Sequence, residues 1–213
     1  MNKQIVQVLE GTPVVPLVQA DRPETAIQIA RALAAGGLAA VEVVFRTDAA
    51  LECLAAVATD VPEVIAGAGT VLNAGQADQA IDAGAAFIVS PGIDADTVKL
   101  CQSRCIPVFP GTITPSEVME ALNLGLSALK FFPASVAGGI SMLKAFGSVF
   151  RGVRFMPTGG VSPANLAEFL QVPCVLACGG SWLTPASAIA SGNYAEITRL
   201  AAAAVAMARQ VRG

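Results

Sequence analysis

The chain has 213 residues, of which 54% are hydrophobic and 14% charged, and its formal net charge is −3. This composition excludes a disordered chain, and the absence of any basic block argues against a nucleic-acid partner. No run reaches the roughly 18 to 20 consecutive apolar residues of a membrane-spanning helix, and the first residues lack the apolar region of a signal peptide. We therefore expect a cytoplasmic protein with no membrane partner.

Short apolar runs recur along the whole chain, and each is followed by a turn and a segment with helical periodicity. Their continuous rather than alternating hydrophobicity is typical of strands that are covered on both faces. The predicted strands are residues 14–18, 40–45, 64–66, 86–89, 107–109, 128–131, 153–156 and 174–177.

Helices are predicted between these runs, beginning with an extra helix at about residues 3–9. Thr47 and Asp48 offer capping side chains to a helix over 49–58, and Thr114 with Glu117 has the spacing of a capping box. The other predicted helices are residues 24–35, 76–83 and 194–211, and one that opens at Ser162.

Eight strand–helix units in a chain of this length predict one (β/α)8 barrel domain spanning residues 1–213, with the extra N-terminal helix closing its bottom. A doubly wound open sheet is the alternative. The segment Gly67-Ala68-Gly69-Thr70 lacks the third glycine of a dinucleotide-binding fingerprint, which favours the barrel.

The chain has no histidine and five cysteines without metal-like spacing. A zinc site is therefore not expected, and we predict no metal and no cofactor. The cysteines are expected to be free, buried thiols in a reducing compartment. Without histidine, any general acid or base must be a carboxylate, lysine, tyrosine or cysteine.

Lys130 stands inside the apolar run 128–131. A buried amine is costly unless it is paired or has a lowered pKa. An uncharged lysine is a nucleophile for carbonyl carbon, so Lys130 is a candidate for imine formation. The alternative is a lysine at a strand end that extends its ammonium group to solvent.

Two charged residues, Glu42 and Arg46, lie four positions apart near the end of one predicted strand, so they share a face. If Glu42 points into the barrel, its carboxylate lies near the Lys130 amine. A buried ion pair that serves structure alone is the alternative. In a barrel, catalytic residues gather at the carboxyl ends of the strands, where all three residues are expected.

Glycine pairs follow the last two predicted strands, Gly159-Gly160 and Gly179-Gly180, and Ser181 follows the second pair. Barrel enzymes often bind phosphate in these two loops, against the N-terminus of a short helix. Tight turns alone are the alternative. An amine, a carboxylate, a guanidinium and a phosphate cradle together suit a keto acid with a distal phosphate, whose carboxylate Arg46 would hold.

Seven motifs resemble those of one family, and they occur in that family's order from about Pro13 to the end. They are VEVVFRT (41–47), GAGTVL (67–72), FIVSPG (87–92), PG (110–111), LKFFP (129–133), FMPTGG (155–160) and GGSW (179–182). The sequence is similar to the 2-keto-3-deoxy-6-phosphogluconate (KDPG) aldolases, the bacterial class I aldolases of the Entner-Doudoroff pathway.

The resemblance implies a (β/α)8 barrel that assembles as a homotrimer. It implies reversible cleavage of KDPG to pyruvate and glyceraldehyde 3-phosphate, without a metal. Lys130 would be the Schiff-base lysine, and Glu42 the general acid/base acting with a water.

The resemblance also implies a set of substrate-binding residues. Arg46 and Thr70 would hold the pyruvate carboxylate, while Pro91 and Phe132 would line the pocket. Thr158 would lie near the hydroxyl-bearing carbons of the substrate. The residues implied for the phosphate are Gly159, Gly160, Gly180 and Ser181.

Departures from the family pattern at Phe45 and at residues 112–114 leave the substrate preference open. 4-Hydroxy-2-oxoglutarate (KHG) and the galactonate-derived epimer of KDPG are alternatives with the same chemistry. A phosphate-binding barrel isomerase or synthase without imine chemistry, and a catalytically silent trimeric assembly protein, are alternatives of other classes.

Overall fold

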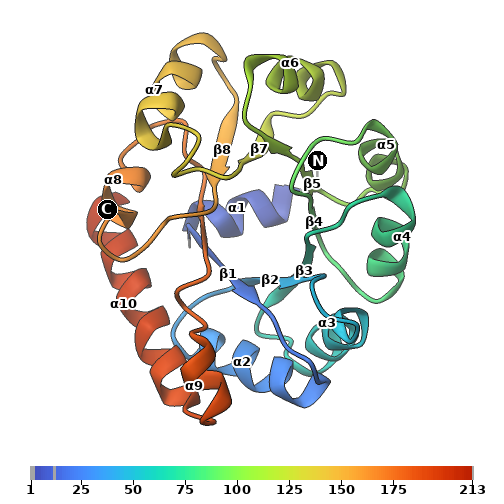
Figure 1. Ribbon diagram of the computed structural model, residues 1–213, viewed down its shortest axis with the longest axis vertical. Coiled ribbons are helices and arrows are strands. Elements are labelled where there is room, and N and C mark those ends of the chain that lie inside the picture. Colours follow the sequence, from blue (N-terminus) through green and yellow to red (C-terminus); the bar gives the residue numbers. More distant parts are fainter. Residues whose placement is uncertain (1–2, 12, 213) are drawn as a thin grey trace.

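Parallel strands form a ring with helices around its outside (Figure 1) in the computed structural model, which describes residues 3–11 and 13–212. The strands are β1 (Val14–Val18), β2 (Ala40–Val44), β3 (Ile65–Gly69), β4 (Ile88–Val89), β5 (Val108–Phe109), β6 (Gly111–Thr112), β7 (Ala128–Phe131), β8 (Arg154–Pro157) and β9 (Cys178–Gly180). The helices are α1 (Lys3–Gly11), α2 (Pro23–Ala35), α3 (Ala50–Asp60), α4 (Ala74–Asp82), α5 (Ala95–Ser103), α6 (Pro115–Asn123), α7 (Gly139–Val149), α8 (Leu166–Leu170), α9 (Ala186–Ala190) and α10 (Tyr194–Arg212).

Two parallel sheets make up the ring, in the orders β5-β4-β3-β2-β1-β9 and β6-β7-β8. β5 and β6 are two parts of one barrel strand, interrupted at Pro110. The Pro110 carbonyl still accepts the Lys130 N–H at 2.9 Å. A parallel bridge between Phe155 and Val175 joins the β8 side to the segment before β9. With β5 and β6 taken as one strand, the ring has eight strands. This confirms the predicted (β/α)8 barrel rather than the open sheet.

The last predicted strand was wrong. Apolarity placed it at 174–177, whereas β9 is Cys178–Gly180 and pairs with β1 from Val14 to Pro16. Within 174–177 only Val175 forms a bridge. Glycine carries no apolar side chain and is depleted in strands, so the sequence pattern ended before the residues that β1 pairs with.

The capping predictions had mixed outcomes. Thr114 and Glu117 form the predicted capping box at α6. In contrast, α3 begins after Ala49 without a side-chain cap, and the Thr47 hydroxyl donates to the Ala20 carbonyl at 2.8 Å. That bond ties the loop after β2 to the loop after β1.

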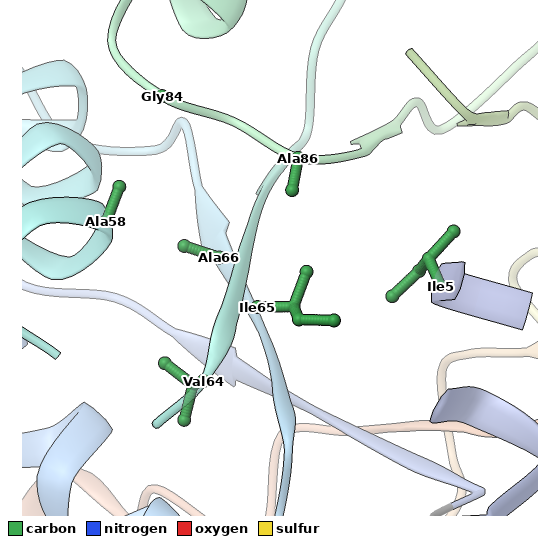
Figure 2. Close-up of a pocket in the computed structure, with 7 residues that line it drawn as sticks. All are labelled: Ile5, Ala58, Val64, Ile65, Ala66, Gly84 and Ala86. Atoms are coloured by element: carbon green, nitrogen blue, oxygen red, sulfur yellow. The ribbon is translucent and has the colours of Figure 1, made fainter. Parts of the chain in front are cut away.

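Helix α1 lies across the centre of the ring (Figure 1) and closes its amino-terminal end, as the sequence predicts. Ile5 and Leu9 are buried in a cluster with interior residues such as Phe87, just before β4, and Phe109 on β5. Beside α1, a cavity of about 260 Å³ is lined by Ile5 and by apolar or small residues around the start of β3 (Figure 2). The side chains that line this cavity are therefore apolar.

No described helix is both long and apolar enough to span a membrane. The five cysteines are all free, and Cys105 is exposed, which the sequence did not predict.

Thiol reactivity should follow burial. Burial raises the pKa of the Cys101 thiol to about 11 and that of Cys178 to about 12, and it also raises the pKa values of Cys53 and Cys174. Because the thiolate is the reactive form, we expect one rapidly reacting thiol in the native protein and five after denaturation, measured with a chromogenic disulfide reagent. Cys105→Ser should remove the fast phase. A second fast thiol in the native protein would contradict this pattern of burial.

Candidate active site

Lys130 and Glu42 meet inside the barrel, from opposite sides of the ring. Lys130 lies on β7 and is 2% exposed, Glu42 lies on β2 and is fully buried, and Lys130 Nζ is 3.6 Å from Glu42 Oε1. Neither Glu42 oxygen has a hydrogen-bond partner within the described part of the chain. Buried polar atoms without partners are rare in folded proteins, so the Glu42 carboxylate is a candidate functional group.

Space for the Glu42 carboxylate is left by a glycine on the neighbouring strand. Glu42 pairs in register with Gly67, yet a Cβ added to Gly69 would overlap the carboxylate. The side chain therefore leans toward the carboxyl end of the strands. It meets there the Lys130 amine, which also lies 5.1 Å from the centre of the Phe132 ring.

Gly69→Ala should displace the Glu42 carboxylate. We expect it to lower catalytic turnover and to cost about 1–3 kcal/mol of unfolding free energy, as overpacking in a buried site does. Gly11→Ala is the matched control, because an added Cβ there has no neighbour within 4 Å. Steady-state kinetics and chemical denaturation would measure both effects, and a Gly69→Ala protein with wild-type turnover would contradict the placement of Glu42.

Arg46 and Thr70 form a second polar pair, in the loops after β2 and β3. The Arg46 Nε donates to the Thr70 hydroxyl at 3.1 Å, which leaves the terminal nitrogens of the guanidinium to contact a carboxylate. Thr70 has φ 59°, a left-handed conformation that is costly for a β-branched residue. Such strain is often found where a side chain is held for function.

Three further predicted residues follow β4, β7 and β8. Pro91 and Phe132 are half-buried, and Thr158 is buried. The Thr158 hydroxyl packs where a side chain on Gly179 would otherwise lie. All three stand at the carboxyl ends of their strands, the end where the Glu42 carboxylate points.

The two glycine loops are neighbours on this rim. The carbonyls of Thr158 and Gly159 accept N–H groups from Ala134 and Ser135, in the turn after β7, at 2.8 and 3.0 Å. In each planar peptide the N–H points opposite to the carbonyl, so the N–H groups of Gly159 and Gly160 turn away from β7, toward the β9 side. Neither donates to another described group.

The β9 side of this space carries the second predicted loop. Gly180 ends β9 and is buried, while Ser181 is exposed, and its N–H also lacks an acceptor among the residues described. Backbone N–H groups without partners in two neighbouring loops are typical of an anion site.

The structure thus brings the predicted residues together at the carboxyl ends of β2, β3, β4, β7, β8 and β9. The cavity in Figure 2 lies at the other end of the barrel, beside α1, and contains none of them. Sequence reasoning did not connect Gly69 with the Glu42 carboxylate, nor Asn165 with the Gly159-Gly160 loop. For Asn165 a signal existed, namely an asparagine placed three residues after Ser162 in a turn sequence.

Comparison with known proteins agrees with the motifs. A family model described as KDPG and KHG aldolase matches residues 5–200. The KHG/KDPG aldolase of Escherichia coli (strain K12) is 46% identical over 198 residues, which cover 93% of both chains.

Two solved structures are similar over almost the whole chain. The 2-keto-3-deoxy-6-phosphogluconate aldolase of Zymomonas mobilis ZM4, crystallised with 3-phosphoglycerate, has a TM-score of 0.90 and 43% identity and covers 97% of each chain. The KDPG aldolase of Legionella pneumophila, with pyruvate captured at low pH as a covalent carbinolamine, has a TM-score of 0.91 and 41% identity, covering 94% of this chain and 97% of that one. The chain therefore belongs to the KDPG and KHG aldolase family.

Proposed function

We propose that this protein is a class I aldolase that cleaves KDPG to pyruvate and glyceraldehyde 3-phosphate. The observation that carries the proposal is the buried Lys130–Glu42 pair, with its amine 3.6 Å from a carboxylate that has no hydrogen-bond partner among the described residues. Structural ion pairs are usually completed by hydrogen bonds. A pair left incomplete at the carboxyl end of a barrel suits a reaction in which the substrate supplies the missing contacts.

In the first step, the Lys130 ammonium gives up a proton, its Nζ adds to the C2 carbonyl carbon of the substrate, and a second nitrogen proton passes to the carbonyl oxygen to give a carbinolamine. Return of the first proton expels that hydroxyl as water and leaves a protonated imine, which is an electron sink. The Legionella relative was captured with pyruvate at the carbinolamine stage. The buried position of Lys130 keeps bulk water away from the imine once it has formed.

In the second step, Glu42 accepts the proton of the C4 hydroxyl through a water. The C3–C4 bond breaks, its electron pair moves into the imine to give an enamine, and glyceraldehyde 3-phosphate leaves. Glu42 then returns the proton to C3, and hydrolysis of the imine releases pyruvate and the amine. The two unpartnered oxygens of Glu42 suit this exchange, because no described group competes for them.

The remaining predicted residues would bind the two ends of the substrate. Arg46, held by Thr70, would bind the pyruvate carboxylate, while Pro91, Phe132 and Thr158 would line the path between the ends. The N–H groups around the space between the two glycine loops would bind the phosphate. The residues proposed for that anion are Gly159, Gly160, Gly180 and Ser181.

Substrate choice is tested by comparing kcat/KM for KDPG, its unphosphorylated analogue 2-keto-3-deoxygluconate, and KHG, with pyruvate release measured by a coupled dehydrogenase assay. We expect KDPG to exceed the unphosphorylated analogue by about 100-fold, since several charge-assisted hydrogen bonds are lost without the phosphate. A kcat/KM that is higher for KHG than for KDPG would identify KHG as the preferred substrate. Absence of pyruvate from all three would refute the aldolase.

The proposal extends to assembly and location. We propose a homotrimer, as the family resemblance implies, and the exposed side chains of Leu72, Met119, Val136 and Val149 offer apolar surface for such contacts. Light scattering coupled to gel filtration would test the trimer. The five free cysteines favour a reducing compartment, so we propose that the protein is cytoplasmic and consists of one domain over residues 1–213.

A further inference from the structure

Asn165 occupies the position before α8 where a side chain would ordinarily cap the helix, yet it makes no cap hydrogen bond. Its side-chain amide turns back to the glycine loop instead. Nδ2 donates to the Gly160 carbonyl at 2.9 Å, and Oδ1 accepts the Ser162 N–H at 2.8 Å. Because oxygen faces a donor and nitrogen faces an acceptor, this pair of bonds fixes the orientation of the amide.

The two bonds determine which way the loop presents its donors. The Gly159 carbonyl is held by the Ser135 N–H at 3.0 Å, and the Gly160 carbonyl is held by Asn165. Since each peptide is planar, fixing the Gly160 carbonyl turns the Val161 N–H in the opposite direction. The N–H groups of Gly160 and Val161 both lack an acceptor within the described residues.

Glycines with positive φ make this loop intrinsically adaptable. Gly159 has φ 94° and Gly160 has φ 81°, a region that only glycine adopts readily. Without external bonds, such a loop would have many conformations, and ordering it would weaken anion binding. Ser135 supplies only a backbone N–H, so Asn165 is the side chain whose removal tests this ordering directly.

We infer that Asn165 is a positioning residue for the phosphate end of the substrate, acting through the Gly160 and Val161 N–H groups. The inference rests on the proposed function, because it requires a phosphate between the two glycine loops. Asn165 itself does not contact the reacting carbons, so imine chemistry at Lys130 is independent of it.

The test compares Asn165→Ala and Asn165→Asp with wild type on KDPG and on 2-keto-3-deoxygluconate. We expect Asn165→Ala to raise the KM for KDPG about tenfold, the size of one or two lost hydrogen bonds. Its kinetics on the unphosphorylated substrate and its borohydride trapping of pyruvate should stay at wild-type levels. Asn165→Asp should raise the KM further, because a carboxylate oxygen would face the Gly160 carbonyl and repel the phosphate.

Asn193→Ala is the matched control, since Asn193 also accepts a backbone N–H, from Glu196 at 3.3 Å, in the turn before α10. It should leave the KM for both substrates unchanged. An equal rise in KM for both substrates in the Asn165 variants, or no rise for KDPG, would overturn the inference while leaving the aldolase intact. A wild type that treats both substrates alike would instead overturn the proposed phosphate site, and this inference with it.

Discussion

Lys130→Ala is expected to reduce aldol cleavage to the background level, a fall of about 10⁵-fold or more. The reason is chemical, since without the amine no imine forms and the C3–C4 electron pair has no acceptor. A coupled assay for pyruvate release measures the loss. Lys99→Ala is the control, because Lys99 is exposed on α5, where it pairs with Asp96 at 3.8 Å.

Folding must be separated from chemistry in this variant. Removing Lys130 leaves the Glu42 carboxylate buried and unpaired, which should cost about 3–5 kcal/mol of unfolding free energy. The double variant Lys130→Met with Glu42→Gln removes both charges and should regain most of that stability while staying inactive. If the refolded double variant still cleaved KDPG above background, Lys130 would not be the nucleophile.

Glu42→Gln is expected to slow turnover by about 10²- to 10⁴-fold, the usual contribution of a general acid or base. Glutamine has the same shape and should fit the space that Gly69 leaves, but it cannot accept and return a proton. Imine formation should therefore continue at Lys130. Single-turnover kinetics with pyruvate trapping separate the two steps.

The exchange of pyruvate methyl protons with deuterium gives a second measurement for Glu42. The wild type should exchange them through the enamine. The exchange rate of Glu42→Gln should be lower by about 10²-fold or more. If Glu42→Gln exchanged the methyl protons of pyruvate at the wild-type rate, a group other than Glu42 would carry out the proton transfer. Gly11→Ala serves again as a neutral control for protein quality.

Most of the barrel was predictable because its strands are covered on both faces and therefore read as continuous apolar runs. β1 and β7 have the predicted bounds. The prediction failed for β9, where the pairing residues include two glycines whose burial comes from the neighbouring β1 rather than from their own hydrophobicity. Local sequence pattern cannot report a partner that lies far away in the chain.

The site was predictable where a residue was out of place in its surroundings. A lysine within an apolar run and a glutamate in the middle of a buried strand are both conspicuous, and the structure brings them to 3.6 Å. Other contacts between residues on different elements or loops were not predictable. Gly69 makes room for Glu42 from the next strand, and Asn165 reaches back to Gly160, so both depend on geometry that spacing alone does not give.

One measurement tests the central claim most directly: reduction of the protein with borohydride in the presence of pyruvate, followed by peptide mass spectrometry. We expect a single N-(1-carboxyethyl) adduct on Lys130 and none on Lys99 or Lys144. No adduct after reduction, or an adduct that maps to any other lysine, would contradict imine catalysis by the buried Lys130–Glu42 pair.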